Sequence, residues 1–179
     1  VIVCGYGRSG QNLSRLLEAE GISFVALDAD PERIRAVVAS GVNVVYGDAS
    51  RREVLVAAGL SRAQAVVVTY ADLHSSMAIL RHVRELRPEL PVVVRTIDDT
   101  HVDALKAAGA AEVVSEVMEG SLMLASHALM LLGVPLTQVL KRIREVRESR
   151  YAIMRGFFRG ASDADDELDQ HAQPRLHTV

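Results

Sequence analysis

The feature that most constrains the fold is a short apolar run followed at once by three glycines with the spacing Gly-x-Gly-x-x-Gly. Residues 1–4 read Val-Ile-Val-Cys, and the glycines are Gly5, Gly7 and Gly10. In a strand–turn–helix, the first glycine permits the tight turn, the second lets backbone approach a phosphate and the third lets the helix pack on the strand. A second apolar run ends on Asp28, where a carboxylate can accept hydrogen bonds from ribose. The combination predicts an adenine-nucleotide site.

Strand and helix patterns alternate over the first 115 residues. The expected strands are 1–4, 24–27, 42–46, 65–68, 92–94 and 112–114, and the expected helices are 11–20, 31–40, 51–58, 73–87 and 100–108. Hydrophobic residues make up 49% of the chain and aromatic residues 4%, which is typical of parallel strands buried on both faces. The prediction is an α/β fold, a Rossmann-like doubly wound six-stranded parallel sheet in the order 3-2-1-4-5-6.

The chain changes character after residue 115. Residues 117–136 are almost entirely apolar, but Glu119, Gly133 and Pro135 make this stretch a marginal transmembrane helix. A helix that is apolar nearly all round is normally buried on all sides, so we expect part of it to pack on another subunit or domain. The predicted domains are a nucleotide-binding domain at 1–115, crossover and dimerisation helices at 116–150, and a partly disordered C-terminal helical extension at 151–179.

The sequence lacks the motifs that several classes of function require. The net charge of −3 argues against a nucleic-acid partner. Cys4 is the only cysteine, and the six histidines form no i, i+4 pair, so we expect no metal site. The chain has no Gly-x-Ser-x-Gly elbow, no Tyr-x-x-x-Lys pair and no phosphate loop of the Gly-x-x-x-x-Gly-Lys type. We therefore expect no catalytic residues.

Further candidate binding residues follow the third expected strand. Gly47, Asp48 and Ala49 come directly after it, in a loop that lies beside the adenine pocket of a Rossmann sheet. Asp48 is expected either to accept from an adenine amino group or to cap the next helix. Ser50 is the better placed of the two as a cap.

Three more polar side chains stand at or near the expected carboxyl edge. Arg8 lies inside the glycine loop, where a cation at a helix start is otherwise unfavourable, so we assign it to a phosphate. Thr69 ends the fourth strand and offers a hydroxyl to ribose or phosphate. Arg95 ends the fifth strand, and two roles stay open for it: pairing with Asp98 or Asp99, or facing a ligand or partner.

These segments resemble the regulator-of-potassium-conductance (RCK) family, also called KTN or TrkA-N domains, and more narrowly the cytoplasmic domain of Kef-type potassium/proton antiporters. The resemblance covers roughly residues 1–150. It is carried by Gly5-Tyr-Gly-Arg-Ser-Gly10, Leu27-Asp-Ala-Asp-Pro31, Tyr46-Gly-Asp-Ala-Ser-Arg51 and Arg95. It implies that the glycine loop holds phosphate, that Asp28 holds ribose, and that Asp48 and Thr69 line the nucleoside pocket. The predicted cofactor-binding residues are Gly5, Tyr6, Gly7, Arg8, Ser9, Gly10, Asp28, Ala29, Gly47, Asp48, Ala49, Thr69 and Arg95.

The resemblance also implies a function. It indicates a regulatory domain that gates a potassium-efflux or cation/proton antiporter, a homodimer through residues 116–150 controlled by a nucleotide. The ligand would be AMP, ATP or NAD(H), and not NADP, because Asp28 would repel a 2′-phosphate. The location would be the cytoplasmic face of a bacterial inner membrane, with this chain a fragment of a longer protein. Some Kef members bind glutathione through a second arginine two residues beyond the first; Ile97 stands there, which argues against glutathione gating.

Two other classes stay open on the sequence alone. A nicotinamide-dependent oxidoreductase shares the fold and the glycine fingerprint, although the residues after the sixth strand look helical and apolar rather than like a substrate site. A soluble interaction module with a purely structural nucleotide is the third hypothesis. Fold alone does not choose between them.

Overall fold

The computed structural model describes residues 1–38 and 41–147 of the chain. Within Val1–Ser121, the first of two compact units, all six strands form one parallel sheet in the order β3-β2-β1-β4-β5-β6. This confirms the predicted fold class and strand order. The strands are β1 (Ile2–Cys4), β2 (Val25–Asp28), β3 (Val44–Tyr46), β4 (Val66–Val68), β5 (Val92–Thr96) and β6 (Glu112–Ser115).

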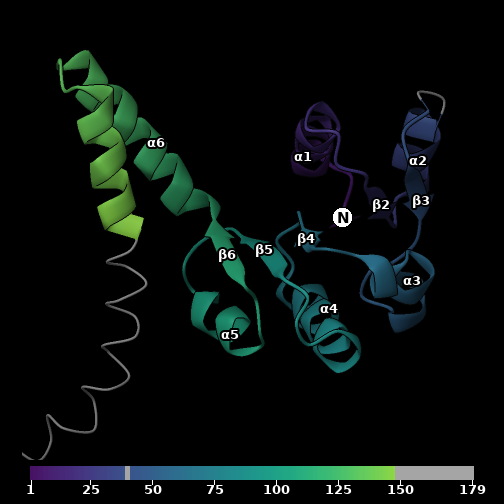
Figure 1. Cartoon of the computed structure of the whole chain (residues 1–179). Helices are drawn as coiled ribbons and strands as arrows, with labels where there is room; N and C mark the ends of the chain where they lie inside the picture. Colours follow the sequence, from purple (N-terminus) through teal and green to yellow (C-terminus); the bar gives the residue numbers. More distant parts are fainter. Residues whose placement is uncertain (39–40, 148–179) are drawn as a thin grey trace, which may run out of the picture. The chain divides into compact units, whose positions relative to one another are not determined.

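Helices cover the sheet on both sides, as Figure 1 shows, with α1 and α2 over one face and α3, α4 and α5 over the other. Their bounds are α1 (Arg8–Ala19), α2 (Pro31–Val38), α3 (Arg52–Ala57), α4 (Leu73–Leu86) and α5 (Val102–Ala107), with a 3₁₀ turn η1 (Leu60–Arg62) before β4. The helix expected to start at residue 100 starts later because Asp98 accepts a hydrogen bond from the Thr100 N–H and closes a turn. The last two residues expected in α2 lie outside the described part of the chain.

The sheet is buried unequally along its width. All three residues of β1 are at most 1% exposed, because helices pack on both of its faces. In β4 to β6 only one face is fully buried. On the side of α1, Val67 and Val93 are partly exposed and Val114 is 36% exposed. No helix of the described first unit lies over that part of the sheet (Figure 1).

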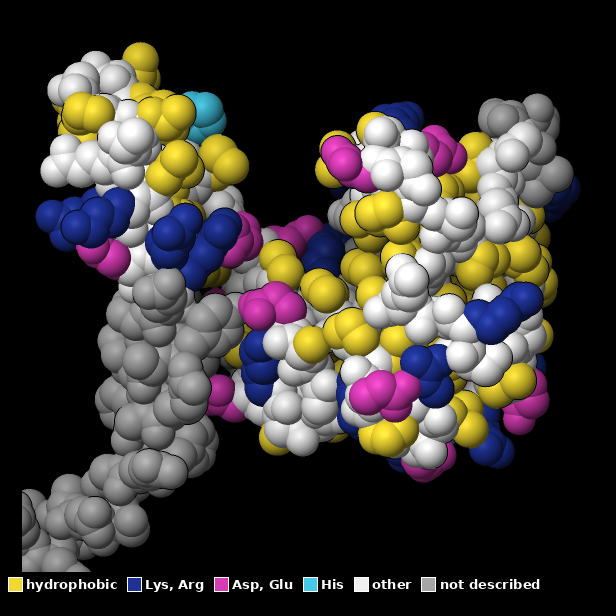
Figure 2. Space-filling view, in the orientation of Figure 1, with side chains coloured by type: hydrophobic (Ala, Val, Ile, Leu, Met, Phe, Trp, Pro, Cys, Tyr) yellow, Lys and Arg dark blue, Asp and Glu magenta, His cyan; other side chains and the backbone are white. Residues whose placement is uncertain are grey.

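The helix α6 (Glu116–Leu131) follows β6 and crosses into the second unit, which begins at Leu122. It ends in a turn at Gly133, whose φ of 84° suits glycine, and another helix is described over residues 136–147. Many apolar side chains of these two helices lie at the surface (Figure 2), among them Leu124 at 73% and Leu131 at 88% exposure. Among the described residues, no helix combines the length and apolar character that crossing a membrane requires. The predicted domain boundaries stay a prediction, and the extension at 151–179 lies outside the described residues.

Candidate functional site

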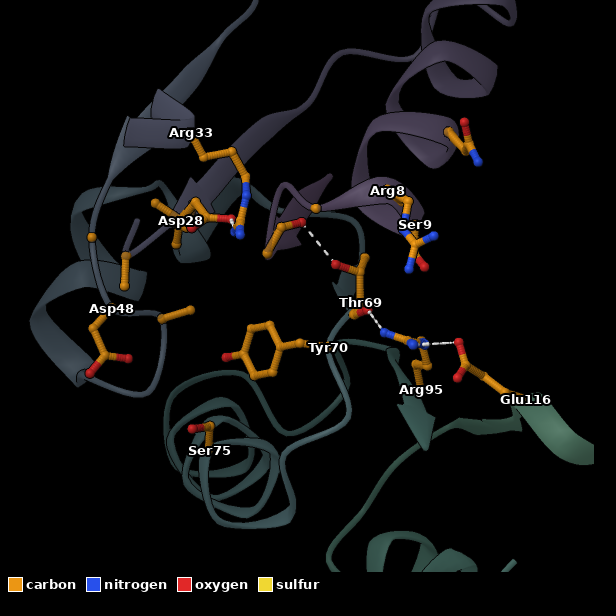
Figure 3. A pocket seen from close by; sticks show the side chains of 17 residues that line it. Arg8, Ser9, Asp28, Arg33, Asp48, Thr69, Tyr70, Ser75, Arg95 and Glu116 are labelled. Carbon is orange, nitrogen blue, oxygen red and sulfur yellow. Dashed lines mark hydrogen bonds and ion pairs between the residues drawn. The ribbon is translucent and has the colours of Figure 1, made fainter. Parts of the chain in front are cut away.

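A large polar pocket lies at the carboxyl edge of the sheet, where the loops after the strands converge (Figure 3). Its volume is about 860 Å³, within the range that small-molecule and cofactor sites occupy. Segments far apart in the sequence meet in it, from the glycine loop after β1 to the start of α6. The lining residues are Gly5, Gly7, Arg8, Ser9, Asn12, Leu27, Asp28, Ala29, Arg33, Gly47, Asp48, Ala49, Thr69, Tyr70, Ser75, Arg95 and Glu116.

The three glycines of the first loop have separate structural roles. Gly5 has a φ of +97°, and a Cβ there would lie 2.7 Å from the Tyr70 ring. A Cβ at Gly10 would lie 2.1 Å from the Gly5 carbonyl oxygen, so only glycine lets α1 pack this closely on the end of β1. A Cβ at Gly7 would meet nothing within 4 Å. Gly7 therefore borders open space in the pocket, where backbone can approach a ligand.

The N-terminus of α1 points into this part of the pocket. Gly7 is its N-cap residue and supplies no side-chain hydrogen bond, so the first N–H groups of the helix are open to a ligand. These groups and the positive end of the helix dipole favour an anion. Arg8 and Ser9, both exposed, line the pocket here, and Figure 3 shows them side by side. This side of the pocket is suited to phosphate.

On the opposite side, Asp28 is buried at 6% exposure and held on both carboxylate oxygens. Its Oδ2 accepts from the Tyr6 N–H and from Arg33, both at 2.7 Å, and its Oδ1 accepts from the Asp30 N–H at 2.8 Å. A carboxylate offers about four acceptor positions. Three are occupied, so Asp28 keeps room for one further donor such as a ribose hydroxyl.

The charge of Asp28 is stabilised by this arrangement. Burial by itself raises the pKa of the carboxyl group, but the hydrogen bonds from Tyr6, Asp30 and Arg33 outweigh burial and hold the pKa below its ordinary value. Asp28 is therefore an ionised acceptor at neutral pH. The same bonds brace the glycine loop, since the Tyr6 N–H is one of the donors.

The loop after β3 forms the rim beside Asp28. Gly47 is buried, and a Cβ there would lie 2.7 Å from Val54, so glycine lets the loop lie tightly on α3. The cap predicted at Ser50 is wrong: the N-cap residue of α3 is Arg51, with no side-chain hydrogen bond. Ser50 instead donates from its N–H and its hydroxyl to Asp48 Oδ1, at 2.9 and 2.7 Å. Asp48 thus closes its own turn at the pocket rim.

The end of β4 supplies the floor of the pocket. The Thr69 hydroxyl is buried and donates to the carbonyls of Cys4 and Gly5, at 3.1 and 2.8 Å. Its described role is therefore to hold the glycine loop, and its remaining lone pairs are what it can offer a ligand. Tyr70 follows, and its ring projects into the centre of the pocket (Figure 3). Burial, together with nearby acidic side chains, raises the pKa of Tyr70, so the hydroxyl stays protonated.

Arg95 lies near the end of β5, on the same side of the pocket as Arg8 and Ser9 (Figure 3). Its Nη1 donates to the Thr69 carbonyl at 2.6 Å, and its Nε and Nη2 contact Glu116 at the start of α6. The sequence had offered Asp98 or Asp99 as the ion-pair partner, but the carboxylate that pairs with Arg95 belongs to Glu116. Asp98 accepts from the Thr100 N–H.

Eleven of the thirteen predicted binding residues line the pocket. The exceptions are Tyr6, whose side chain packs in the core with Val3 and Val44, and Gly10, which packs on Gly5. Both residues support the glycine loop by packing beneath it rather than by lining the pocket. The sequence reasoning missed Asn12, Leu27, Arg33, Tyr70, Ser75 and Glu116.

A signal for some of these existed in the sequence. All carboxyl ends of a parallel sheet share one edge, so Tyr70 was identifiable as the residue after Thr69, and Glu116 as a residue just beyond the sixth expected strand. Arg33 lies in the first turn of α2, and only the structure shows that its guanidinium donates to the Asp28 carboxylate.

Comparison with known proteins gives matches at three levels. Residues 1–116 match the TrkA-N domain family. The chain is 40% identical over all 179 residues to a putative K⁺ efflux antiporter KefB of Alkalimonas amylolytica, of which it spans 27%. A structure of the Shewanella denitrificans Kef C-terminal domain in AMP-bound form aligns with a TM-score of 0.70 and 32% identity, covering 84% of this chain and 92% of that one. The GsuK protein bound to ADP aligns with a TM-score of 0.60 and 31% identity, covering 70% and 32%.

Proposed function

The chain belongs to the TrkA-N domain family, and we propose that it is a nucleotide-binding regulatory domain of a potassium-efflux antiporter rather than an enzyme. One observation carries the proposal: a single pocket joins the open N-terminus of α1 to the buried, ionised Asp28. That arrangement suits a phosphate at one end and a ribose at the other. The relatives add the transporter, because the full-length match is to an antiporter of which this chain spans about a quarter.

The proposed ligand is an adenine nucleotide: AMP, ATP or NAD(H). The AMP-bound Kef domain and the ADP-bound GsuK protein are both more than 30% identical to this chain, which supports an adenosine phosphate in the pocket. The placement that we propose is phosphate at Arg8, Ser9 and the α1 N-terminus, ribose at Asp28, and the base toward the loop of Asp48. Gly5, Ala29, Gly47, Ala49 and Tyr70 form the surrounding wall.

The proposal includes discrimination against NADP. A 2′-phosphate would remove the hydroxyl that Asp28 can accept from and would bring negative charge against a buried carboxylate. We expect calorimetry to give NADPH an affinity at least tenfold weaker than that of NADH, which corresponds to about 1.4 kcal/mol. Equal or tighter binding of NADPH would refute this discrimination.

The proposed mode of action is a shift between two arrangements of a homodimer. A ligand changes such an equilibrium only through different affinities for the two arrangements. The exposed apolar side chains of α6 and of the helix at 136–147 support dimerisation through residues 116–150, because contiguous apolar surface of this kind usually marks an interface. The partly exposed face of β4 to β6, on the side of α1, supports dimerisation as well, since parallel sheets are normally covered on both faces. The proposed location is the cytoplasmic face of the membrane that holds the transporter.

One experiment separates this proposal from an oxidoreductase. Mass spectrometry of small molecules released from the purified chain should find AMP, ADP, ATP or NAD(H). If NAD(H) is found, the absorbance of NADH should stay constant when 2-oxo acids, aldehydes or ketones are added as hydride acceptors. Turnover of NADH with any of these would contradict the regulatory proposal and favour the enzyme. Absence of every adenine nucleotide, with no binding of added AMP or NADH, would refute the proposed ligand.

A further inference from the structure

The ion pair of Arg95 and Glu116 stands between two cavities of the first unit. Both residues line the nucleotide pocket, and both also line an apolar groove of about 440 Å³ on the partly exposed face of β4 to β6. Ser9, at the start of α1, lines both cavities too. The pair is therefore part of the wall that the two cavities share. Figure 3 shows it at the edge of the pocket, on the side of Arg8 and Ser9.

All three guanidinium nitrogens of Arg95 are already engaged by oxygens of the chain. Nη1 donates to the Thr69 carbonyl, while Nε and Nη2 both contact the same oxygen of Glu116. The pair is partly exposed, with 29% of the Arg95 side chain and 45% of the Glu116 side chain accessible. Such a pair is weak enough to exchange partners, because exposed ion pairs contribute little stability.

A phosphate is a better partner for this guanidinium than Glu116 is in the described arrangement. Arginine binds phosphate with two parallel N–H···O bonds, whereas here two nitrogens share one carboxylate oxygen. A phosphate at the same guanidinium would also stand close to the Glu116 carboxylate, and like charges at that range repel. Binding of the phosphate therefore favours departure of Glu116.

Glu116 is the first residue of α6, so its departure changes the beginning of that helix. Among the contacts that hold the start of α6 near the end of β5 are the ion pair itself and the hydrogen bond from the Val117 N–H to the Ile97 carbonyl at 3.0 Å. Loss of the ion pair removes the side-chain contact of Glu116 and leaves the backbone hydrogen bond of Val117 in place. The freed carboxylate can then accept hydrogen bonds from the N-terminal N–H groups of α6, which attract negative charge.

We propose that Arg95 exchanges between Glu116 and the phosphate of the bound nucleotide, so that occupancy of the pocket is transmitted to the first turn of α6. The proposal rests on the proposed function, because it takes the ligand to be a nucleotide. It assigns Glu116 the role of an internal competitor that lowers ligand affinity and links the pocket to α6.

The test uses the full 179-residue chain, with AMP as the probe in calorimetry. Glu116→Gln removes the competing charge and keeps the shape of the side chain. We expect AMP to bind about two- to fivefold more tightly to this variant, the range that an exposed ion pair is worth. Glu112→Gln is the matched control. It makes the same charge change at the other end of β6, where Glu112 pairs with Lys106 at 3.4 Å, and it should keep the wild-type affinity.

A second measurement follows α6 directly. Hydrogen exchange of the peptide covering residues 116–121 should change when AMP is added to the wild type. In Glu116→Gln it should already match the AMP-bound wild type without ligand and change no further. In Arg95→Lys, the single ammonium group cannot form two parallel hydrogen bonds to a phosphate. AMP should therefore bind more weakly to this variant and should not change the hydrogen exchange of this peptide.

Three outcomes separate the hypotheses. If Glu116→Gln binds AMP with wild-type affinity and keeps the AMP-dependent exchange, the transfer of Arg95 is refuted while the proposed function stands. If the variant gains affinity but α6 exchanges as before, the competition is real and the link to α6 is refuted. If the wild type binds none of AMP, ADP, ATP and NADH, the proposed function fails and this inference fails with it.

Discussion

At Gly10 the chain has no space for a single methyl group, because the position of a Cβ lies 2.1 Å from the Gly5 carbonyl oxygen. Gly10→Ala should therefore push α1 away from β1 and lower the free energy of unfolding by about 1–3 kcal/mol, the usual cost of overpacking. Chemical denaturation followed by circular dichroism measures this. A variant with wild-type stability would mean that α1 is not packed on the strand end as described.

Gly7→Ala is the matched control for Gly10→Ala within the same loop. Gly7 has a φ of −71°, and a Cβ there meets nothing within 4 Å, so the unfolding free energy should stay within about 0.5 kcal/mol of wild type. The added methyl group enters the pocket beside the α1 N-terminus, and AMP should bind measurably more weakly in calorimetry. Unchanged AMP affinity would place the phosphate elsewhere.

Asp28 combines a ligand role with a structural one, and Asp28→Asn tests both. The amide can accept less strongly than the carboxylate, so AMP affinity should fall by about 1–3 kcal/mol. Asp98→Asn, at an exposed position outside the nucleotide pocket, should leave AMP affinity unchanged. If Asp28→Asn binds AMP like the wild type, the ribose does not lie at Asp28.

The same variant has a signature at acid pH. Because the folded pKa of Asp28 is lowered from 3.8, its charge stabilises the fold fully above that value, and this contribution is lost as the pH falls through the lowered pKa. The gap in unfolding free energy between wild type and Asp28→Asn should therefore be constant near neutral pH and narrow below pH of about 4. A gap that widens in acid would mean that the Asp28 pKa is raised rather than lowered.

At the scale of the element, α4 is fixed by its first turn. Asp72 is the N-cap and accepts from the Ser75 N–H at 2.7 Å, and Ser75 lines the nucleotide pocket. Asp72→Ala should cost about 1 kcal/mol of stability in thermal or chemical unfolding. Asp72→Ser can still cap and should recover most of that loss. Equal losses in the two variants would show that Asp72 acts through something other than the cap.

The elements of the sheet were predictable because their signals are local. Apolar runs, Pro31 at a helix start and the glycines after helix ends mark each unit within a few residues, and parallel strands with these connections have few possible orders. Helix caps were less predictable: Ser50 has the residue type of a cap, yet it donates to Asp48. Competition between neighbouring polar groups for one N–H depends on loop geometry that the residue types do not specify.

The parts of the site that come from one sequence motif were predictable. The contacts between residues far apart in the sequence were not. The glycine loop and Asp28 follow from their spacing. The partner of Arg95 does not, because Glu116 is 21 residues away and reaches Arg95 only after β5 and β6 pair. That pair is therefore set by tertiary packing. The pair of Arg33 and Asp28 is only five residues apart, and it depends on how the first turn of α2 follows β2.

At the scale of the whole molecule, the exposed apolar side chains of α6 predict self-association. Leu124→Glu places a charge at a position that is 73% exposed in the single chain, so it should not disturb the fold. We expect wild type to sediment as the proposed dimer and this variant as a monomer in sedimentation velocity. Leu16→Glu is the matched control, since Leu16 is 67% exposed on α1 outside the proposed interface. It should remain dimeric. A dimer that survives Leu124→Glu would exclude that face of α6 from the contact.

The carboxylates that hold Arg33 and Arg95 act as counter-ions built into the protein. A simple anion such as sulfate or free phosphate brings no sugar hydroxyl for Asp28, so any anion that separates one of these pairs gains less than a nucleotide does. We therefore expect the pocket to bind common inorganic anions more weakly than a complete nucleotide. The domain would then report the concentration of a complete nucleotide rather than the ionic composition of the medium.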